Sequence, residues 1–76
     1  MLNERYFQPI INCISLNSGR IRLLDELVFE INDILPKGRR MTKKEIANLF
    51  VYLRKKGENG NIPIKIKHEG PLYSFY

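Results

Sequence analysis

Apolar side chains recur at helical spacing in the middle of the chain. A stripe of leucine, valine and isoleucine begins at Leu23 and ends at Leu35, and it predicts an amphipathic helix over 22–35. Acidic residues cover the other side of this helix. We expect Ser18 or Asn17 to cap its start, because a side-chain oxygen there can accept from an otherwise unpaired amide of the first turn.

A second helix is predicted over 42–56, where apolar residues again repeat at helical spacing. Thr42-Lys43-Lys44-Glu45 has the pattern of a capping box, in which the threonine hydroxyl accepts from the Glu45 amide and the carboxylate accepts from the Thr42 amide. Gly57 is expected to end this helix. The predicted buried stripe consists of Ile46, Leu49, Phe50 and Leu53.

The start of the chain is open to two interpretations. Pro9 suits the first position of a helix and Asn17-Ser18-Gly19 would end it, so we expect a short helix over 9–16, although the same run would suit a strand. Residues 1–8 would form a short flexible arm or the frayed start of that helix. A homodimer through this segment is a hypothesis that rests on its apolar residues, which are Tyr6, Phe7, Ile10 and Ile11.

The end of the chain has the pattern of a β-hairpin over 62–76. Isoleucine alternates with proline and lysine up to Lys67, which is strand periodicity. A two-residue turn at Glu69-Gly70 would place Ile66 opposite Tyr73, on a face that packs against the helices. The other face would carry Lys65, Lys67, Leu72, Ser74 and Tyr76.

The length of the chain and the distribution of its charges restrict the fold and the kind of partner that we expect. At 76 residues the chain is expected to be one domain, 1–76, of the α+β class, with three helices followed by a C-terminal hairpin. Residues 1–36 hold three basic and five acidic residues, whereas residues 37–76 hold ten basic and three acidic ones. Such a split indicates an anionic partner for the second half, with nucleic acid as the leading candidate.

This order of three helices and a basic hairpin resembles a winged helix-turn-helix domain. In that family the third helix usually enters the major groove and the hairpin, or wing, contacts the flanking backbone. The end of the chain is also similar, more loosely, to the winged-helix effector domains of response regulators, in Leu53-Arg54-Lys55-Lys56, Ile64-Lys65-Ile66 and Gly70-Pro71-Leu72-Tyr73-Ser74-Phe75.

The resemblance implies a transcriptional regulator that binds double-stranded DNA with helix 42–56 and the wing. Asn48 and Lys44 are the residues on that helix suited to read base edges, which is a thin set, so weakly specific binding is expected. The implied DNA-binding residues are Lys37, Arg39, Arg40, Lys43, Lys44, Asn48, Tyr52, Lys55, Lys65 and Lys67.

No catalytic site is apparent in the sequence. His68 is the only histidine and falls in a predicted turn, and Cys13 is the only cysteine, so we expect no enzyme, no metal site and no cofactor. The cations near the end of helix 42–56, which are Arg54, Lys55 and Lys56, also have a structural interpretation, since cations are favourable at a helix C-terminus. One enzymatic alternative is a small basic ribonuclease of the toxin type, which would need no metal.

The stronger rival is a protein-binding inhibitor or adaptor of the kind found in phages and plasmids. The acidic face of helix 22–35 and Phe29, which falls off its apolar stripe, are candidates for such a surface, together with Val51, Tyr52, Leu72 and Tyr76. The lone cysteine leads us to expect an intracellular protein, and no apolar run is long enough to span a membrane.

Overall fold

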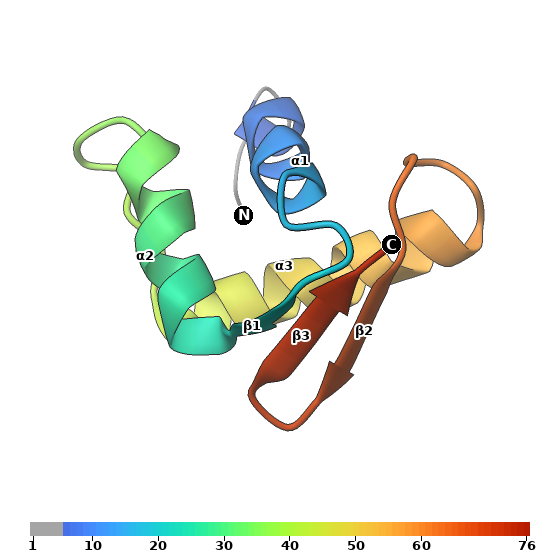
Figure 1. Cartoon of the computed structure of the whole chain (residues 1–76). Coiled ribbons are helices and arrows are strands. Elements are labelled where there is room, and N and C mark those ends of the chain that lie inside the picture. The colour runs from blue at the N-terminus through green and yellow to red at the C-terminus, as the bar shows by residue number, and fades with distance from the viewer. Residues whose placement is uncertain (1–5) are drawn as a thin grey trace.

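The computed structural model describes residues 6–76 and places their elements in the order α1, β1, α2, α3, β2, β3 (Figure 1). The helices are α1 (Phe7–Ser15), α2 (Leu24–Ile34) and α3 (Lys43–Glu58). The strands are β1 (Ile21–Leu23), β2 (Ile66–Glu69) and β3 (Leu72–Phe75). They form one antiparallel sheet with β3 in the centre, so the expected α+β class is confirmed and the sheet has a third strand that we did not predict.

Helix α1 begins earlier than expected. Its first residue is Phe7, which leaves Pro9 still within the first turn, where a missing amide hydrogen costs nothing. The helical interpretation of this segment is therefore confirmed and the strand is excluded. Of the two alternatives for residues 1–8, the structure favours the start of the helix at Phe7 and Gln8, which are helical, and residues 1–5 lie outside the described part of the chain.

The start of α2 differs from the prediction, because the preceding residues form β1. The backbone amide of Leu23 donates to the Glu26 carboxylate at 3.2 Å, and the amide of Leu24 donates to the Pro71 carbonyl at 2.8 Å. Neither Ser18 nor Asn17 caps the helix, so that expectation was wrong. One acceptor, the Glu26 carboxylate, belongs to the helix itself, and the other, the Pro71 carbonyl, belongs to the hairpin. The residues next to the helix in the sequence do not reveal the second acceptor, because it lies far away along the chain.

Helix α3 begins as predicted and ends differently. The Glu45 amide donates to the Thr42 hydroxyl at 3.2 Å, and the Thr42 amide donates to the Glu45 carboxylate at 2.9 Å, which confirms the capping box. Gly57 does not end the helix, which runs on to Glu58. A Cβ on Gly57 would lie 2.3 Å from the Ile64 carbonyl oxygen, so glycine is needed there for the close approach of the segment leading into β2.

The hairpin is shifted by two residues from its predicted register. Ile66 pairs with Phe75 and His68 pairs with Tyr73, so the turn residues are Gly70 and Pro71, and Gly70 has a φ of +56°. A shift of two keeps every side chain on its predicted face, because neighbouring residues of a strand point to opposite faces. The prediction was therefore right about the faces and wrong about the partners.

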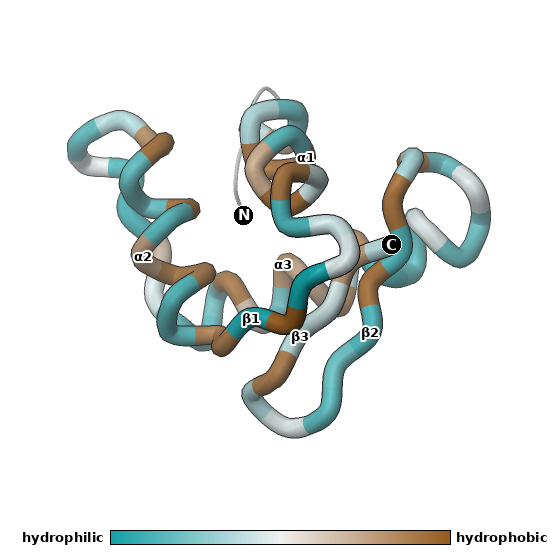
Figure 2. The backbone as a smooth tube through the Cα atoms, viewed as in Figure 1, coloured by the Kyte–Doolittle hydropathy of each residue, from teal (hydrophilic) through white to brown (hydrophobic). Residues whose placement is uncertain are grey.

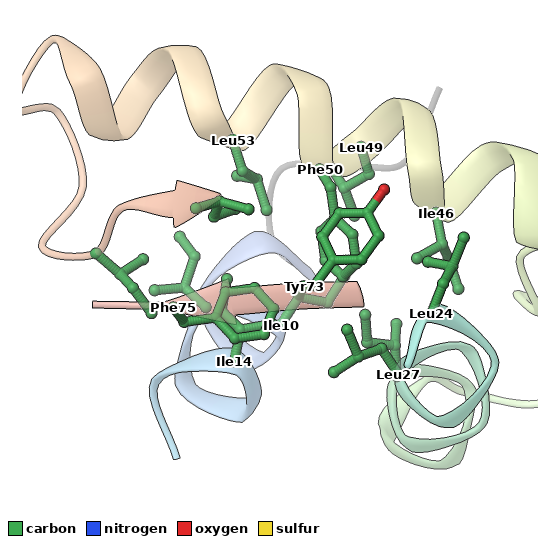
Figure 3. Close-up of a cluster of buried hydrophobic side chains, with 14 of the residues drawn as sticks. Ile10, Ile14, Leu24, Leu27, Ile46, Leu49, Phe50, Leu53, Tyr73 and Phe75 are labelled. Carbon is green, nitrogen blue, oxygen red and sulfur yellow. The ribbon is translucent and has the colours of Figure 1, made fainter. Parts of the chain in front are cut away.

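The core lies between α3, the inner face of the sheet and the other two helices (Figure 3). Phe50 of α3 is its centre: its ring lies 5.1 Å from the ring of Tyr73 and 5.9 Å from that of Phe75, between centroids. Ile10 is completely buried and Ile11 almost so, which means that the residues behind the dimer hypothesis are used inside a single chain. The remaining buried apolar residues are Ile14, Leu24, Leu27, Ile31, Leu35, Ile46, Leu49, Leu53, Ile64 and Ile66.

Candidate nucleic-acid interface

Helix α3 presents one line of exposed residues on the side opposite its buried stripe. The line consists of Lys44, Asn48, Val51 and Lys55, four of the residues that the helical pattern directs outward. Neither Lys44 nor Lys55 forms an ion pair with any residue in 6–76. Two uncompensated cations therefore flank an amide side chain on an open helical surface.

Two further predicted residues of α3 lie off this line. Lys43 pairs with Asp25 of α2 at 2.8 Å, and both side chains are exposed, so the pair contributes little and can be exchanged for another anion. The ring of Tyr52 packs against Phe7 of α1 with 5.7 Å between centroids, and Lys56 lies over it at 5.3 Å. Tyr52 therefore faces α1 and is half-buried, which separates it from the outward line.

The predicted cations of the connector lie in a separate loop. Lys37, Arg39 and Arg40 are exposed, between α2 and α3. The side chain of Asn32 closes this loop, because its amide nitrogen donates to the Met41 carbonyl at 2.9 Å and its oxygen accepts from the Met41 amide at 2.7 Å. In Figures 1 and 2 the loop stands at the opposite end of α2 from β1 and is well apart from the hairpin turn, so the structure does not bring these cations together with the wing.

The two predicted wing lysines point away from α3. Lys67 lies opposite Ser74, and Lys65 and Tyr76 exchange backbone hydrogen bonds of 2.6 and 3.0 Å, so both lysines lie on the outer face of the hairpin. The inner face holds Tyr73 and Phe75, whose rings contact α3. The outward line of α3 and the outer face of the sheet are therefore on opposite sides of the core.

Two residues that were not predicted to belong to the interface lie close to its outward line: Arg54 of α3 and His68 of β2. A narrow crevice between α3 and the hairpin is lined by Arg54 and His68, with Phe50, Val51, Ile66 and Tyr73. The His68 ring stacks on Tyr73, with 4.9 Å between centroids and 16° between planes. The alternation of Ile64, Ile66 and His68 could have revealed this position. His68 was not assigned to the inner face because it was predicted to lie in the turn.

The polar atoms of the crevice are incompletely paired. The Nε of Arg54 is shielded from solvent and has no hydrogen-bond partner, and its nearest carboxylate oxygen is that of Glu58 at 3.9 Å. Burial raises the pKa of the Tyr73 hydroxyl above its ordinary value of 10.0, an effect that the positive charge of Arg54 partly offsets. Tyr73 therefore stays protonated near neutral pH, and Arg54 is the permanent charge in the crevice.

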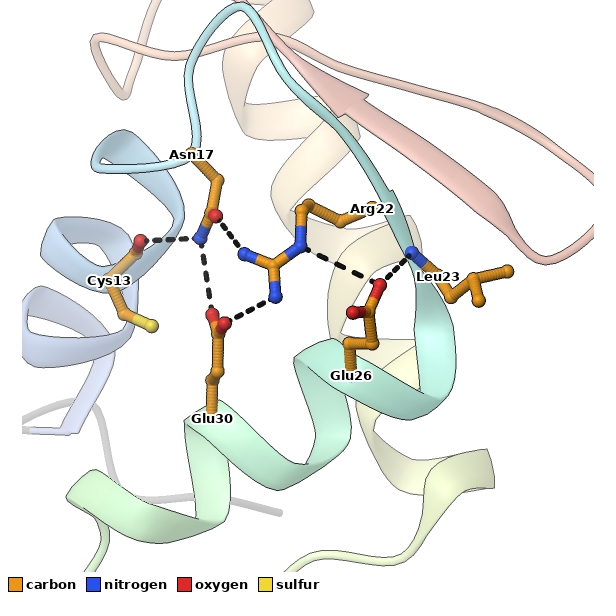
Figure 4. A network of polar contacts seen from close by, with 6 residues as sticks. All are labelled: Cys13, Asn17, Arg22, Leu23, Glu26 and Glu30. Carbon is orange, nitrogen blue, oxygen red and sulfur yellow. Dashed lines mark hydrogen bonds and ion pairs between the residues drawn. The ribbon is translucent and has the colours of Figure 1, made fainter.

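The charges near α2 pair with each other instead (Figure 4). The guanidinium of Arg22 binds Glu30 and the side-chain oxygen of Asn17, and it lies 3.7 Å from Glu26. The Asn17 amide nitrogen donates to the Cys13 carbonyl at 3.1 Å and to Glu30 at 3.3 Å. The hydrogen bond to Glu30 raises the pKa of Arg22 above its already high ordinary value, so this cluster stays charged and paired.

Further evidence on the chemistry of the described part of the chain comes from its possible metal ligands, the lone cysteine and the length of its helices. Within residues 6–76, no three side chains of the His, Cys, Asp or Glu type are grouped so that they could hold a metal ion. Cys13 is half-buried, and burial followed by the nearby Glu30 raises the pKa of its thiol, which disfavours the reactive thiolate. None of the helices in that part is both long and apolar enough to cross a membrane.

Comparison with protein-family models, with curated proteins and with solved structures finds no match for this chain.

Proposed function

We propose that the chain is a winged helix-turn-helix protein that binds duplex DNA, with the outward line of α3 in the major groove. The observation that carries the proposal is the pair of lysines Lys44 and Lys55, on either side of Asn48, which have no ion-pair partner among residues 6–76. The order of elements supports it, since three helices followed by a hairpin are the arrangement on which the resemblance rests.

The chemistry of this line suits a phosphate backbone. Lysines that neutralise phosphates release condensed counterions, and this gives affinity without regard to sequence. Asn48 can pair with the edge of an adenine, and Lys44 can donate to a guanine. With two residues for base readout, the proposed protein binds many sequences with similar affinity and prefers some of them modestly.

The acidic residues of α2 do not oppose this docking mode. Asp25 is the acidic residue that reaches α3, and Lys43 pairs with it at 2.8 Å. Glu26 and Glu30 face Arg22. The carboxylates that α2 brings closest to α3 thus have cationic partners within the chain, and phosphates would meet the cations of α3.

The test is the salt dependence of the affinity for a random-sequence duplex, measured between about 50 mM and about 200 mM salt. Each lysine on a phosphate contributes roughly 0.9 to the slope of log affinity against log salt. The double variant Lys44→Gln/Lys55→Gln should therefore lower that slope by about 1.8. The matched control is Lys65→Gln/Lys67→Gln, which removes the same charge from the outer face of the sheet and should lower the slope by clearly less.

Two results would contradict the proposal. The wild-type protein does not bind DNA at low salt, or the control pair lowers the slope as much as the α3 pair. The second result would show that a diffuse positive field, and not the line on α3, is responsible for the binding.

One observation favours a protein-binding module as the second candidate. Ile21 of β1 is 71% exposed and Tyr76 is 61% exposed, and Leu23 and Leu72 pair on the same outer face of the sheet. An apolar row of this kind across two strands is typical of a surface that a partner covers. Absence of DNA binding at low salt, followed by loss of a captured partner in Ile21→Ser, would favour this function.

A further inference from the structure

The outer face of the sheet carries its side chains in two rows that cross all three strands. The first row is Ile21, Ser74 and Lys67, and the second row is Leu23, Leu72 and Glu69. Outward side chains recur at every second residue of a strand, so the rows are about 7 Å apart along the strands. Each row therefore has an apolar end on β1 and a charged end on β2, with β3 between them.

The charged ends of the two rows have opposite signs and no partner in the described part of the chain. Neither Lys67 nor Glu69 forms an ion pair with any residue in 6–76. A ligand with charges of one sign only would be attracted by one of these side chains and repelled by the other. A complementary partner must present both signs, in the reverse order and at the same spacing.

The centre of the face has a recess next to a projection. A hollow of about 160 Å³ opens around Ser74, the smallest side chain of the two rows, and its walls include Ile21, Lys67 and Leu72. Leu72, the next outward residue of β3, is large and 44% exposed. An apolar cavity of about 150 Å³ admits a group as large as benzene, so a leucine side chain fits into the hollow.

A second copy of the chain presents this pattern in reverse. A two-fold axis that runs across the strands, midway between the rows, stacks each strand on the same strand of the second copy and exchanges the two rows. Lys67 then faces Glu69 of the second copy, and Leu72 faces the hollow at Ser74. Ile21 faces Leu23, so apolar side chains meet at the other end of the rows. Each contact occurs twice, because a two-fold interface uses the same patch on both copies.

We propose that the chain forms a homodimer through the outer face of its sheet, with Lys67 of each copy paired with Glu69 of the other. The two sheets stack face to face, about 10 Å apart, as the layers of a β-sandwich do. Three short strands offer less than the roughly 1,200 Å² that stable interfaces bury in total. The dimer is therefore weak, with a dissociation constant on the order of 0.1 mM.

This dimer differs from the one that the sequence suggested, and it is independent of DNA binding. The apolar residues that suggested a dimer through the start of the chain include Ile10 and Ile11, which are buried within one copy. The outward line of α3 lies on the opposite side of the core from the outer face of the sheet. Lys44 and Lys55 of both copies thus remain accessible in the dimer.

The experiment uses two charge reversals that complement each other. Lys67→Glu places carboxylates opposite each other in both contacts, and Glu69→Lys places ammonium groups opposite each other. Either variant alone should raise the dissociation constant about tenfold. An equal mixture of the two should form a heterodimer with about the wild-type dissociation constant, because each carboxylate then faces a lysine. Sedimentation velocity without DNA, at low ionic strength and from about 10 µM to about 2 mM protein, measures these constants.

Two further variants test the place of the interface. Asp33→Lys is the control for Glu69→Lys: it makes the same change of charge at an exposed residue of α2 that has no ion pair in 6–76, and it should keep the wild-type dissociation constant. Leu72→Ser removes the side chain that enters the hollow in both copies, and it should raise the constant more than tenfold.

The outcomes separate this proposal from the proposed function. A wild-type chain that stays monomeric up to about 2 mM overturns the dimer, and the DNA-binding proposal is then judged by its own salt dependence. A dimer that the two reversals do not weaken, or that their mixture does not restore, also overturns the proposal. A monomer that captures a different protein through Ile21 would assign the outer face to the protein-binding function instead.

Discussion

Helices α2 and α3 pack on the same core and carry charges of opposite sign on their exposed sides. The 11 residues of α2 include four carboxylates, whereas the 16 residues of α3 include five cations. Three of the four carboxylates have a cationic partner: Glu26 and Glu30 face Arg22, and Asp25 faces Lys43. On α3, Lys44 and Lys55 have no such partner in residues 6–76, and Arg54 has only a distant one.

The comparison of the two helices distinguishes charged side chains whose ion pairs stabilise the fold from charged side chains that are available to bind a ligand. Arg22 is 12% exposed and joins α2 to the loop after α1 through Glu30 and Asn17. Arg54 lines the narrow crevice between α3 and the hairpin and keeps an Nε donor without a hydrogen-bond partner. Net charge alone does not distinguish these cases, since what matters is whether each charge already has a partner.

The largest expected effect comes from displacing α3 itself. Gly57→Ala would place a methyl group 2.3 Å from the Ile64 carbonyl oxygen, so the helix or the segment before β2 must move. We expect a loss of about 3 kcal/mol in the free energy of unfolding, measured by urea denaturation. Gly60→Ala is the control, because its site has open space and a positive φ of 75°, and it should cost about 1 kcal/mol. Equal losses for the two variants would show that the close approach at Gly57 is unimportant.

The two arginines offer a sharper test of the comparison. Arg22→Met leaves the Glu30 carboxylate and the buried Asn17 without their main partner, and it should lower the free energy of unfolding by about 2 kcal/mol. Arg54→Met removes only a long surface pair and an unsatisfied donor, and it should change stability by less than about 0.5 kcal/mol. Thermal unfolding of both variants at one pH measures the difference. Similar losses for the two would mean that Arg54 is a structural residue, as its place near the helix end also allows.

The smallest expected effect lies at the start of α3 and depends on pH. The hydrogen bonds that Glu45 makes with Thr42, the backbone amide first, lower the pKa of the Glu45 carboxyl below its ordinary value of 4.5. A lowered pKa means that the folded state favours the charged carboxylate, so this contribution is complete above about pH 4.5 and disappears as the pH falls through the lowered value. Glu45→Gln should therefore be less stable than wild type at neutral pH and approach it in acid. Unfolding midpoints of the wild-type protein and of Glu45→Gln between about pH 3 and pH 7 measure this difference, and parallel pH profiles for the two proteins would contradict it.

Local patterns in the sequence were sufficient for the presence of the three helices, though not for all of their ends, and for the faces of the hairpin. The capping box at Thr42 was correct because all its atoms lie within one turn of helix. The inner and outer faces of the hairpin were also correct, because alternation alone decides them. The register was wrong by two residues, since a Gly70-Pro71 turn and a Glu69-Gly70 turn produce the same alternation.

The candidate site was predictable only in part, because local patterns in the sequence do not show how distant segments pack together. Lys44, Asn48 and Lys55 were identified by helical periodicity, and the structure keeps them on one exposed line. Arg54 and His68 were missed, because their meeting depends on how α3 crosses the hairpin. The cations of the connector and of the wing were grouped with α3 by charge, and the fold places them elsewhere.

By itself the sequence determined that this is an α+β chain with two amphipathic helices, a basic second half and a two-faced hairpin, because these features depend on residues close together in the chain. Only the tertiary structure decided which charges are paired. Arg22 pairs with Glu30 because β1 leads directly into α2, and Arg54 and His68 line the same crevice because Gly57 lets the segment before β2 pass against α3. Contacts between distant segments follow from the packing of whole elements, and no local pattern encodes them.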